Sequence, residues 1–175
     1  MAEAASGRGG AGPTIRWART PDVRAIRAIV APMAQSRVLI AKEAVTYYEA
    51  LQQFRVAELD GQVVGCGALH VMWEDLAEIR TLAVRPEAKG AGVGSALLGA
   101  LVEDARQLGV RRLFCLTFEV DFFSRHGFEP IEGQAVDPEV YAELLRSYDE
   151  GVAEFLDLER VKPNTLGNTR MLRQL

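Results

Sequence analysis

A basic, glycine-rich turn separates an apolar strand pattern from a long amphipathic helix pattern. The turn reads Lys89-Gly90-Ala91-Gly92-Val93-Gly94-Ser95. Glycine lets the backbone approach a ligand closely, and the N–H groups that open a helix suit a phosphate at the positive end of the helix dipole. The spacing matches neither the dinucleotide fingerprint GxGxxG nor the P-loop GxxxxGK[ST]. We therefore expect a phosphate site of another kind, with an ordinary tight turn as the alternative.

Two charged side chains interrupt the apolar strand pattern before this turn. Over Leu76–Val84, strand geometry predicts Glu78, Arg80, Leu82 and Val84 on one face and the intervening side chains on the other. A Glu and an Arg in a central strand are costly in a dry core unless they pair or line a cleft. The pattern allows both interpretations: a structural ion pair, or a charged wall of a binding site.

A third segment, DFFSRHGF over Asp121–Phe128, completes a resemblance to the GCN5-related N-acetyltransferase (GNAT) superfamily. The pyrophosphate loop of that superfamily is usually written (Arg/Gln)-x-x-Gly-x-(Gly/Ala), and Lys89-x-x-Gly92-x-Gly94 resembles it with lysine in the first place. The phenylalanine segment resembles the family pattern Phe-Tyr-x-x-x-Gly-Phe. The resemblance implies acetyl-CoA as co-substrate and a strand 76–84 that splays from its neighbour.

The same resemblance implies roles for particular residues. Residues 89–95 and Phe122 would hold CoA, and the main chain at Leu82, Ala83 and Val84 would bind the pantetheine arm. The Leu82 N–H would polarise the thioester carbonyl, where negative charge develops during attack. Phe123 lies at the position where many members carry a tyrosine that protonates the departing CoA thiolate. Because a free thiol has a pKa of about 8.5, the thiolate can leave without a protein acid, or it can take a proton from water.

The wider sequence resembles the acetyltransferase domain of N-acetylglutamate synthase, in a short stand-alone form like those of actinobacteria. The resemblance covers residues 16–128 and rests on the runs GCGALH, DLAEIR and Leu116-Thr117. It implies transfer of acetyl to the α-amine of L-glutamate or L-glutamine, the first step of arginine biosynthesis. The sequence leaves open which of the two amino acids is the acceptor.

An amino-acid acceptor needs cations for its carboxylates and a base for its protonated amine. Candidate cations are Lys42, Arg80, Lys162 and Arg170, each of which could instead be a solvated surface charge. By resemblance, Lys42, Asn164 and Arg170 match acceptor-binding positions, and we also expect Thr117 in this site. Glu78 is the first candidate base, with support of Arg80 as its alternative role.

Two other functions remain open from the sequence. The chain could acetylate another small amine or a peptide N-terminus, although such a site would favour acidic side chains around the acceptor. It could also be a non-catalytic sensor that binds acyl-CoA. Thiol release with a panel of amino acids separates these possibilities.

Composition excludes several classes of protein. The net charge of -4 argues against nucleic-acid binding. The two cysteines and two histidines show no metal-ligand spacing, so we expect no metal and a cytoplasmic protein with reduced thiols. No apolar run has the length of a membrane span. A homodimer is one option that the sequence leaves open.

The elements that must position these residues predict one α+β (α/β/α) domain over residues 14–175, after a disordered tail at 1–13. Its sheet should be mixed but mostly antiparallel, flanked by helices. Asp60-Gly61 predicts a hairpin between FRVAEL and QVVGCGALHVMW. A helix should follow Gly92, with its apolar stripe ending at Leu108, and one helix should span Asp137 to about Asp157. No chemistry is assigned to residues 131–161.

Overall fold

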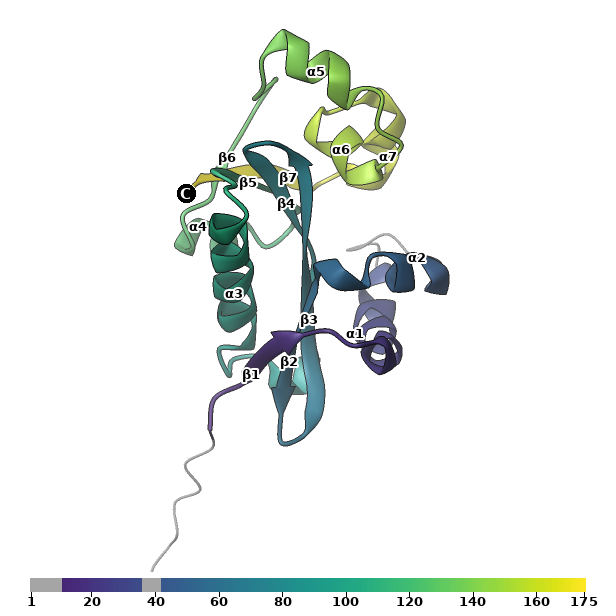
Figure 1. Cartoon of the computed structure of the whole chain (residues 1–175), viewed down its shortest axis with the longest axis vertical. Coiled ribbons are helices and arrows are strands. Elements are labelled where there is room, and N and C mark those ends of the chain that lie inside the picture. The colour runs from purple at the N-terminus through teal and green to yellow at the C-terminus, as the bar shows by residue number, and fades with distance from the viewer. Residues whose placement is uncertain (1–10, 36–41) are drawn as a thin grey trace, which may run out of the picture.

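The strands form one seven-stranded sheet in the order β1-β2-β3-β4-β5-β7-β6 (Figure 1). The computed structural model describes residues 11–35 and 42–175, apart from the side chains of residues 164 and 165. Within that part, neighbouring strands are antiparallel except for the parallel pair β4 and β5. The strands are β1 Thr14–Trp17, β2 Phe54–Leu59, β3 Gln62–Trp73, β4 Leu76–Val84, β5 Arg112–Thr117, β6 Glu129–Pro130 and β7 Thr169–Gln174. The predicted α+β sheet architecture is confirmed.

Helices cover both faces of this sheet, and a further group packs at its β5–β7 end (Figure 1). α1 and α2 lie on one face, while α3 and α4 lie on the other. The α-helices are α1 Val23–Gln35, α2 Ala44–Glu49, α3 Val93–Gln107, α4 Val120–Arg125, α5 Pro138–Leu144, α6 Glu150–Phe155 and α7 Lys162–Thr165. Short 3-10 turns lie at Thr20–Asp22, Leu51–Gln53, Pro86–Ala88 and Glu159–Val161.

The hairpin between β2 and β3 turns at Asp60-Gly61, as predicted. Both residues have positive φ, 48° and 76°. Two successive left-handed residues match the right-handed twist of the flanking strands, which is why an Asp-Gly pair favours this turn. The two strands begin and end where the sequence pattern predicts.

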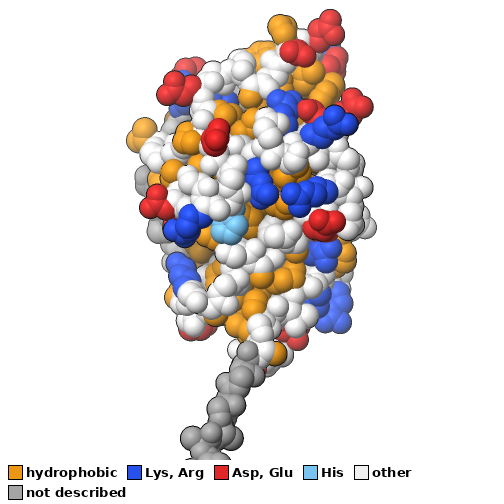
Figure 2. All heavy atoms as spheres, turned by 90° about the vertical axis from the view of Figure 1, so that its left-hand side faces the viewer, with side chains coloured by type: hydrophobic (Ala, Val, Ile, Leu, Met, Phe, Trp, Pro, Cys, Tyr) orange, Lys and Arg blue, Asp and Glu red, His pale blue; other side chains and the backbone are white. Residues whose placement is uncertain are grey.

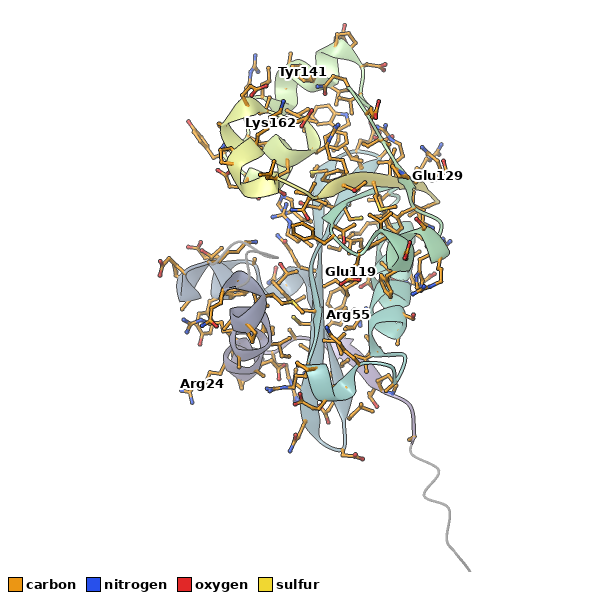
Figure 3. All side chains as sticks on the ribbon, turned by 180° about the vertical axis from the view of Figure 1, so that it is seen from behind. Arg24, Arg55, Glu119, Glu129, Tyr141 and Lys162 are labelled. Carbon is orange, nitrogen blue, oxygen red and sulfur yellow. The ribbon has the colours of Figure 1, made fainter. Side chains whose placement is uncertain are left out.

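The apolar stripe of α3 packs on the sheet and fixes the position of the glycine turn that precedes it. Val93, Leu97, Leu98 and Leu101 are at most 1% exposed. Leu108, which the stripe was expected to include, is 64% exposed because the helix ends at Gln107. On the same side, Arg55 reaches from β2 to α3 and donates two hydrogen bonds to Asp104 (Figure 3).

A bulge at Thr81 breaks the regular alternation of β4. Thr81 has φ 56°, and the pairing with β3 shifts between Ala68↔Arg80 and Cys66↔Ala83. The extra residue moves the later side chains to the opposite face. Ile79 packs with the α3 cluster and Ala83 with the α1 cluster, although simple alternation predicted one face for both. The expectation that Leu82 and Val84 share the face of Glu78 and Arg80 is therefore wrong: both pack against α3-side residues.

The splayed strand pair implied by the family resemblance is present. β4 and β5 are paired only from Leu76↔Arg112 to Glu78↔Phe114. Beyond Glu78, the side of β4 that faces away from β3 has no strand partner in the described structure. Backbone N–H and C=O groups along that side remain available to a ligand.

The single helix expected from Asp137 to about Asp157 is instead two helices. α5 ends at Leu144 and α6 begins at Glu150, with Asp149 as the N-cap. The Asp149 carboxylate accepts a hydrogen bond from the Val152 N–H at 3.1 Å. An aspartate in this position satisfies a donor of the first helical turn and therefore stabilises a new helix start.

In the part of the chain that the structure describes, no helix combines the length and the apolar character needed to cross a membrane. The face seen in Figure 2 carries acidic and basic side chains intermixed, with no continuous basic stripe.

Replacing Leu101 by Ala should lower the free energy of unfolding by about 2–5 kcal/mol, because it leaves a cavity between α3 and the sheet. Urea unfolding measures the change. Leu108→Ala is the matched control on an exposed residue at the end of the same helix, and its effect should stay within about 0.5 kcal/mol. Equal effects of the two substitutions would contradict this description of the core.

Candidate active site

One cavity of about 1000 Å³ lies where β4 and β5 part. Its walls come from β4, the glycine turn, the end of β5, α4, the start of α2 and the start of α6. It brings together most of the residues predicted for the site: Lys42, Glu78, Arg80, Leu82, Ala83, Val84, Lys89, Gly90, Gly92, Val93, Gly94, Ser95, Thr117 and Phe122. Residues chosen separately for a cofactor and for an acceptor thus share a single space.

The glycine turn forms one end of the cavity. Gly92 is the N-cap of α3 and has φ 76°, a conformation that a side chain would strain. The first hydrogen bond of the helix runs from the Ala96 N–H to the Gly92 carbonyl, so the N–H groups at 93–95 have no helical partner. These donors and the nearby Lys89 form an arrangement that suits a phosphate.

Aromatic side chains of α4 close the cavity beside this turn. A Cβ added at Gly94 would lie 3.5 Å from the Phe122 ring, so the start of α3 and α4 pack closely. His126 bridges the two helices through Ser95 Oγ at 3.1 Å. Phe123 lines the cavity, is 6% exposed and packs edge-on against Phe128 at 5.2 Å. It brings no ionisable group to the position where the family resemblance implies a tyrosine.

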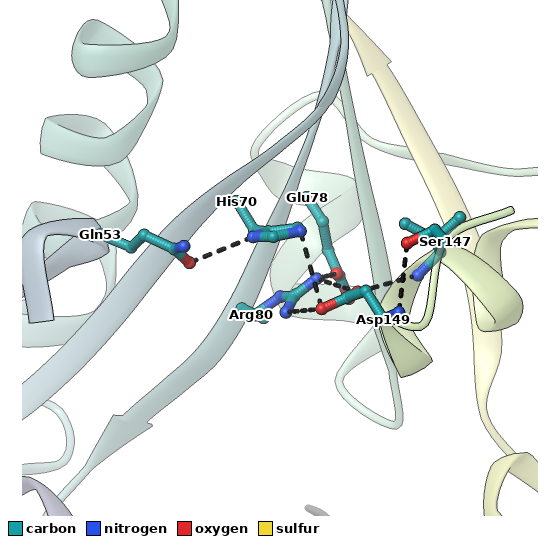
Figure 4. Close-up of polar contacts among 7 residues, drawn as sticks. Gln53, His70, Glu78, Arg80, Ser147 and Asp149 are labelled. Atoms are coloured by element: carbon teal, nitrogen blue, oxygen red, sulfur yellow. Dashed lines mark hydrogen bonds and ion pairs between the residues drawn. The ribbon is translucent and has the colours of Figure 1, made fainter. Parts of the chain in front are cut away.

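The opposite part of the cavity holds a network of charges around Arg80 (Figure 4). Glu78 Oε2 accepts from Arg80 Nε at 2.9 Å and from Nη2 at 2.5 Å. Asp149 accepts from Nη1 and Nη2 of the same guanidinium at 3.0 and 2.8 Å. His70 lies next to the network, with Nε2 3.6 Å from Asp149 and Nδ1 3.3 Å from Gln53. The ion pair between Glu78 and Arg80 predicted as one alternative is present, and it also lines the cavity.

Asp149 and Glu154 of α6 were missed because residues 131–161 received no chemical role. The sequence signal was available for Asp149, since it precedes Glu150 and a short apolar run as an N-cap residue does. Its partner Arg80 is 69 positions away in the chain. Only the fold brings the two together.

Gly151 is the point where α6 meets β4. A Cβ built there would lie 2.9 Å from the carboxyl carbon of Glu78 and would overlap the Glu78 and Arg80 side chains. Only glycine lets the helix backbone approach this closely. The first turn of α6 is therefore packed directly against the ion pair.

Burial and charge shift the titration of these groups in different directions. Burial raises the pKa of Glu78, with Arg80 opposing the change. Burial also acts on Asp149, but the hydrogen bonds from Arg80 prevail and lower its pKa to about 2. Desolvation and the charge of Arg80 lower the pKa of both His70 and Lys42. Lys42 is exposed as a residue and lines the cavity wall.

Several predicted residues lie elsewhere. Arg170 on β7 donates to the backbone carbonyls of Gly133 and Phe155, so the structure does not bring it to the cavity. Lys162 pairs with Glu159 at 2.8 Å on the surface. Ala91 belongs to the turn but does not line the cavity. The side chain of Asn164, and residues 1–10 of the expected tail, lie outside the described part of the structure.

Asp149→Asn should lower the free energy of unfolding by about 1–3 kcal/mol at pH 7, because it removes a charged partner of Arg80 but keeps a capping side chain. The pKa of Asp149 in the folded protein is about 2, whereas the pKa of an aspartate in the unfolded chain is about 3.9. A lowered pKa stabilises the fold above the unfolded value, so the difference between the proteins should shrink as the pH falls from about 5 toward 2.

Urea unfolding at pH 7, 4 and 3 measures that difference. Glu143→Gln removes an exposed surface ion pair with Arg146 and should change the stability by no more than about 0.5 kcal/mol. A pH-independent difference for Asp149→Asn would contradict the charge assignment.

Comparison with known proteins agrees with this geometry. The family model described as Acetyltransferase (GNAT) family matches residues 16–128. An amino-acid acetyltransferase of Mycobacterium tuberculosis is 57% identical over 163 residues, which are 91% of this chain and 93% of that protein. An amino-acid acetyltransferase of Neisseria meningitidis is 33% identical over 118 residues, 66% of this chain but 27% of that longer protein.

Solved structures extend the likeness to nearly the whole chain. Rv2747 from Mycobacterium tuberculosis, in a complex that includes CoA, has TM-score 0.90 and 57% identity, over 93% of this chain and 99% of that chain. N-acetylglutamate synthase from Neisseria gonorrhoeae, complexed with coenzyme A and N-acetyl-glutamate, has TM-score 0.75 and 25% identity, over 94% of this chain and 35% of that one. The motif, the splayed sheet and these matches agree: the chain belongs to the acetyltransferase (GNAT) family.

Proposed function

We propose that this chain is an acetyl-CoA-dependent amino-acid N-acetyltransferase that acts on the α-amine of L-glutamate or L-glutamine. The observation that carries the proposal is the shared cavity, which joins a phosphate-type glycine turn to cationic side chains at Arg80 and Lys42. A CoA-binding end and a carboxylate-binding end are what this transfer needs in one space. The amino-acid acetyltransferase of Mycobacterium tuberculosis, 57% identical over nearly the same length, supports the same activity.

On the CoA side, the N–H groups at 93–95 and Lys89 would hold the pyrophosphate. The backbone of Leu82–Val84, on the unpaired side of β4, would hydrogen-bond the pantetheine arm. Phe122 beside Gly94 would pack against the same arm.

On the acceptor side, Lys42 is the stronger candidate to bind a carboxylate. Four of the five N–H groups of Arg80 already donate to Glu78 and Asp149, which leaves one on Nη1. Arg80 would therefore supply one fixed donor, while Lys42 would supply charge. Thr117 at the end of β5 accepts from the Glu119 N–H, so its hydroxyl proton is available to the acceptor.

In the reaction, the neutral α-amine attacks the thioester carbonyl and the carbon–sulfur bond then breaks. The N–H of Leu82, at the bulge, would stabilise the charge that develops on the carbonyl oxygen. Phe123 cannot donate a proton to the CoA sulfur. The CoA thiolate can still leave, because the pKa of its thiol is only about 8.5. The acetylated amino acid would enter arginine biosynthesis, and the enzyme would be cytoplasmic.

A panel assay tests this function directly. The protein is mixed with acetyl-CoA and one acceptor at a time: glutamate, glutamine, aspartate, lysine or a short peptide. Free thiol is then measured. We expect release with glutamate or glutamine. No release with glutamate, glutamine or aspartate would overturn the proposal; release only with lysine or peptide would favour another amine, and CoA binding without any release would favour a sensor.

Lys89→Ala should raise the Kd for CoA by about 5–30-fold, because it removes a cation beside the pyrophosphate while keeping the backbone donors. Isothermal titration calorimetry with CoA measures the change. Arg24→Ala, on the exposed face of α1 far from the turn (Figure 3), is the matched loss of one positive charge. A similar Kd for the two variants would place the CoA phosphates away from Lys89.

A further inference from the structure

Glu154 has a carboxyl group that the fold holds in the cavity without a partner. It lies on α6, is partly buried and lines the cavity. Within the described part of the chain, it makes no hydrogen bond and no ion pair. A partly buried carboxyl without a partner is costly, so its retention in a binding cavity points to a ligand or a reacting group.

The geometry of α6 turns Glu154 toward the charged end of the cavity. Gly151, three residues earlier, contacts the Glu78–Arg80 pair so closely that no side chain fits there. Residues three apart lie on the same face of a helix. Glu154 therefore sits one turn further along the face that abuts β4.

Charged and titratable groups from several elements line the cavity around this end. They include Glu78 and Arg80 on β4, His70 on β3, Lys42 before α2, and Tyr148, Asp149 and Glu150 at the start of α6. Burial, reinforced by the negative charge of Glu78, raises the pKa of Glu154 to about 7, and Arg80 and Lys42 act against the rise. A proton acceptor works best when its pKa lies near the working pH.

The candidate proton acceptors in contact with Arg80 or Asp149 are already engaged. Glu78 and Asp149 both accept hydrogen bonds from Arg80, and protonating either would weaken a buried ion pair. His70 has Gln53 at one ring nitrogen and Asp149 at the other. Unlike Glu78, Asp149 and His70, Glu154 lines the cavity with a carboxylate that has no hydrogen-bond partner among the described residues.

We propose that Glu154 is the general base that takes a proton from the α-ammonium group of the acceptor amino acid. The inference rests on the proposed acetyltransferase function and assigns Glu78 to positioning Arg80. The ammonium gives one proton to the Glu154 carboxylate, and the neutral amine forms the new bond to the acetyl carbon. As the carbon–sulfur bond breaks, the surplus proton on nitrogen passes to the CoA sulfur, directly or through water. Glu154 then returns its proton to solvent.

The pH dependence of three variants tests this role. For the wild type, kcat/KM should rise with pH through a pKa near 7, because the ionised carboxylate is the active form. Glu154→Gln should lose that transition and about 100-fold in kcat/KM at pH 7. Its deficit should narrow toward pH 9, where a growing share of the acceptor amine is already neutral. Glu78→Gln should be slower but keep the transition near pH 7.

Glu139→Gln removes an exposed carboxylate on α5 and should behave as wild type. The Kd for CoA and the unfolding temperature of each variant show whether the fold and the cofactor end are intact. If the wild type is active but Glu154→Gln keeps its rate and its pH transition, the role of Glu154 is excluded while the acetyltransferase function stands. Loss of the transition in Glu78→Gln alone would assign the base to Glu78. A wild type that is inactive with every acceptor would instead overturn the proposed function.

Discussion

The parting of β4 from β5 after Glu78 is the constraint on which the site depends. While two strands stay paired, their backbone groups bind each other and no space exists between them. The bulge at Thr81 adds a residue on the β3 side of β4, which turns the strand's later side chains over and increases its local twist. α3 then packs Leu97 and Leu101 against the sheet and holds the glycine turn at the mouth of the opening. The cavity is thus built by leaving hydrogen bonds unmade in a place where a ligand can make them.

Charge, rather than apolar packing, closes the opposite end of that space. Arg80 is bound by a carboxylate from its own strand and by another from the start of α6. Burying three charges costs solvation free energy, which is recovered only when the geometry is good and the polar atoms are satisfied. Asp149 improves the balance because the same side chain caps a helix. The arrangement fixes α6 over the cavity, where Glu154 and Lys42, together with the remaining N–H of Arg80, can interact with a substrate.

Local signals in the sequence predicted much of this structure. The Asp60-Gly61 turn, strand 76–84, the apolar stripe after Gly92 and the glycine turn each depend on neighbouring residues. All lie where they were expected, except that the stripe ends before Leu108. The bulge was not predictable in this way, since a β-branched residue such as Thr81 favours a regular strand. The break before Asp149 was hidden by a run rich in Leu, Ala and Glu. Arg170 was assigned to the acceptor from its charge and from the family resemblance, whereas its Nη2 donates to the backbone carbonyls of Gly133 and Phe155.

Because α6 approaches β4 so closely at Gly151, the residue types that can occur at positions 78, 80, 149 and 151 depend on one another. A side chain there would meet Glu78 and Arg80, and those two are balanced in turn by Asp149. A single replacement at 78, 80 or 149 leaves a buried charge without its partner. A side chain at 151 would force α6 away from β4. Divergence through this region should therefore proceed by joint substitution. In a homologue with a neutral residue at 80, the carboxylates at 78 and 149 would no longer be needed to balance a charge. Smaller side chains at 78 and 80 would then also remove the need for glycine at 151.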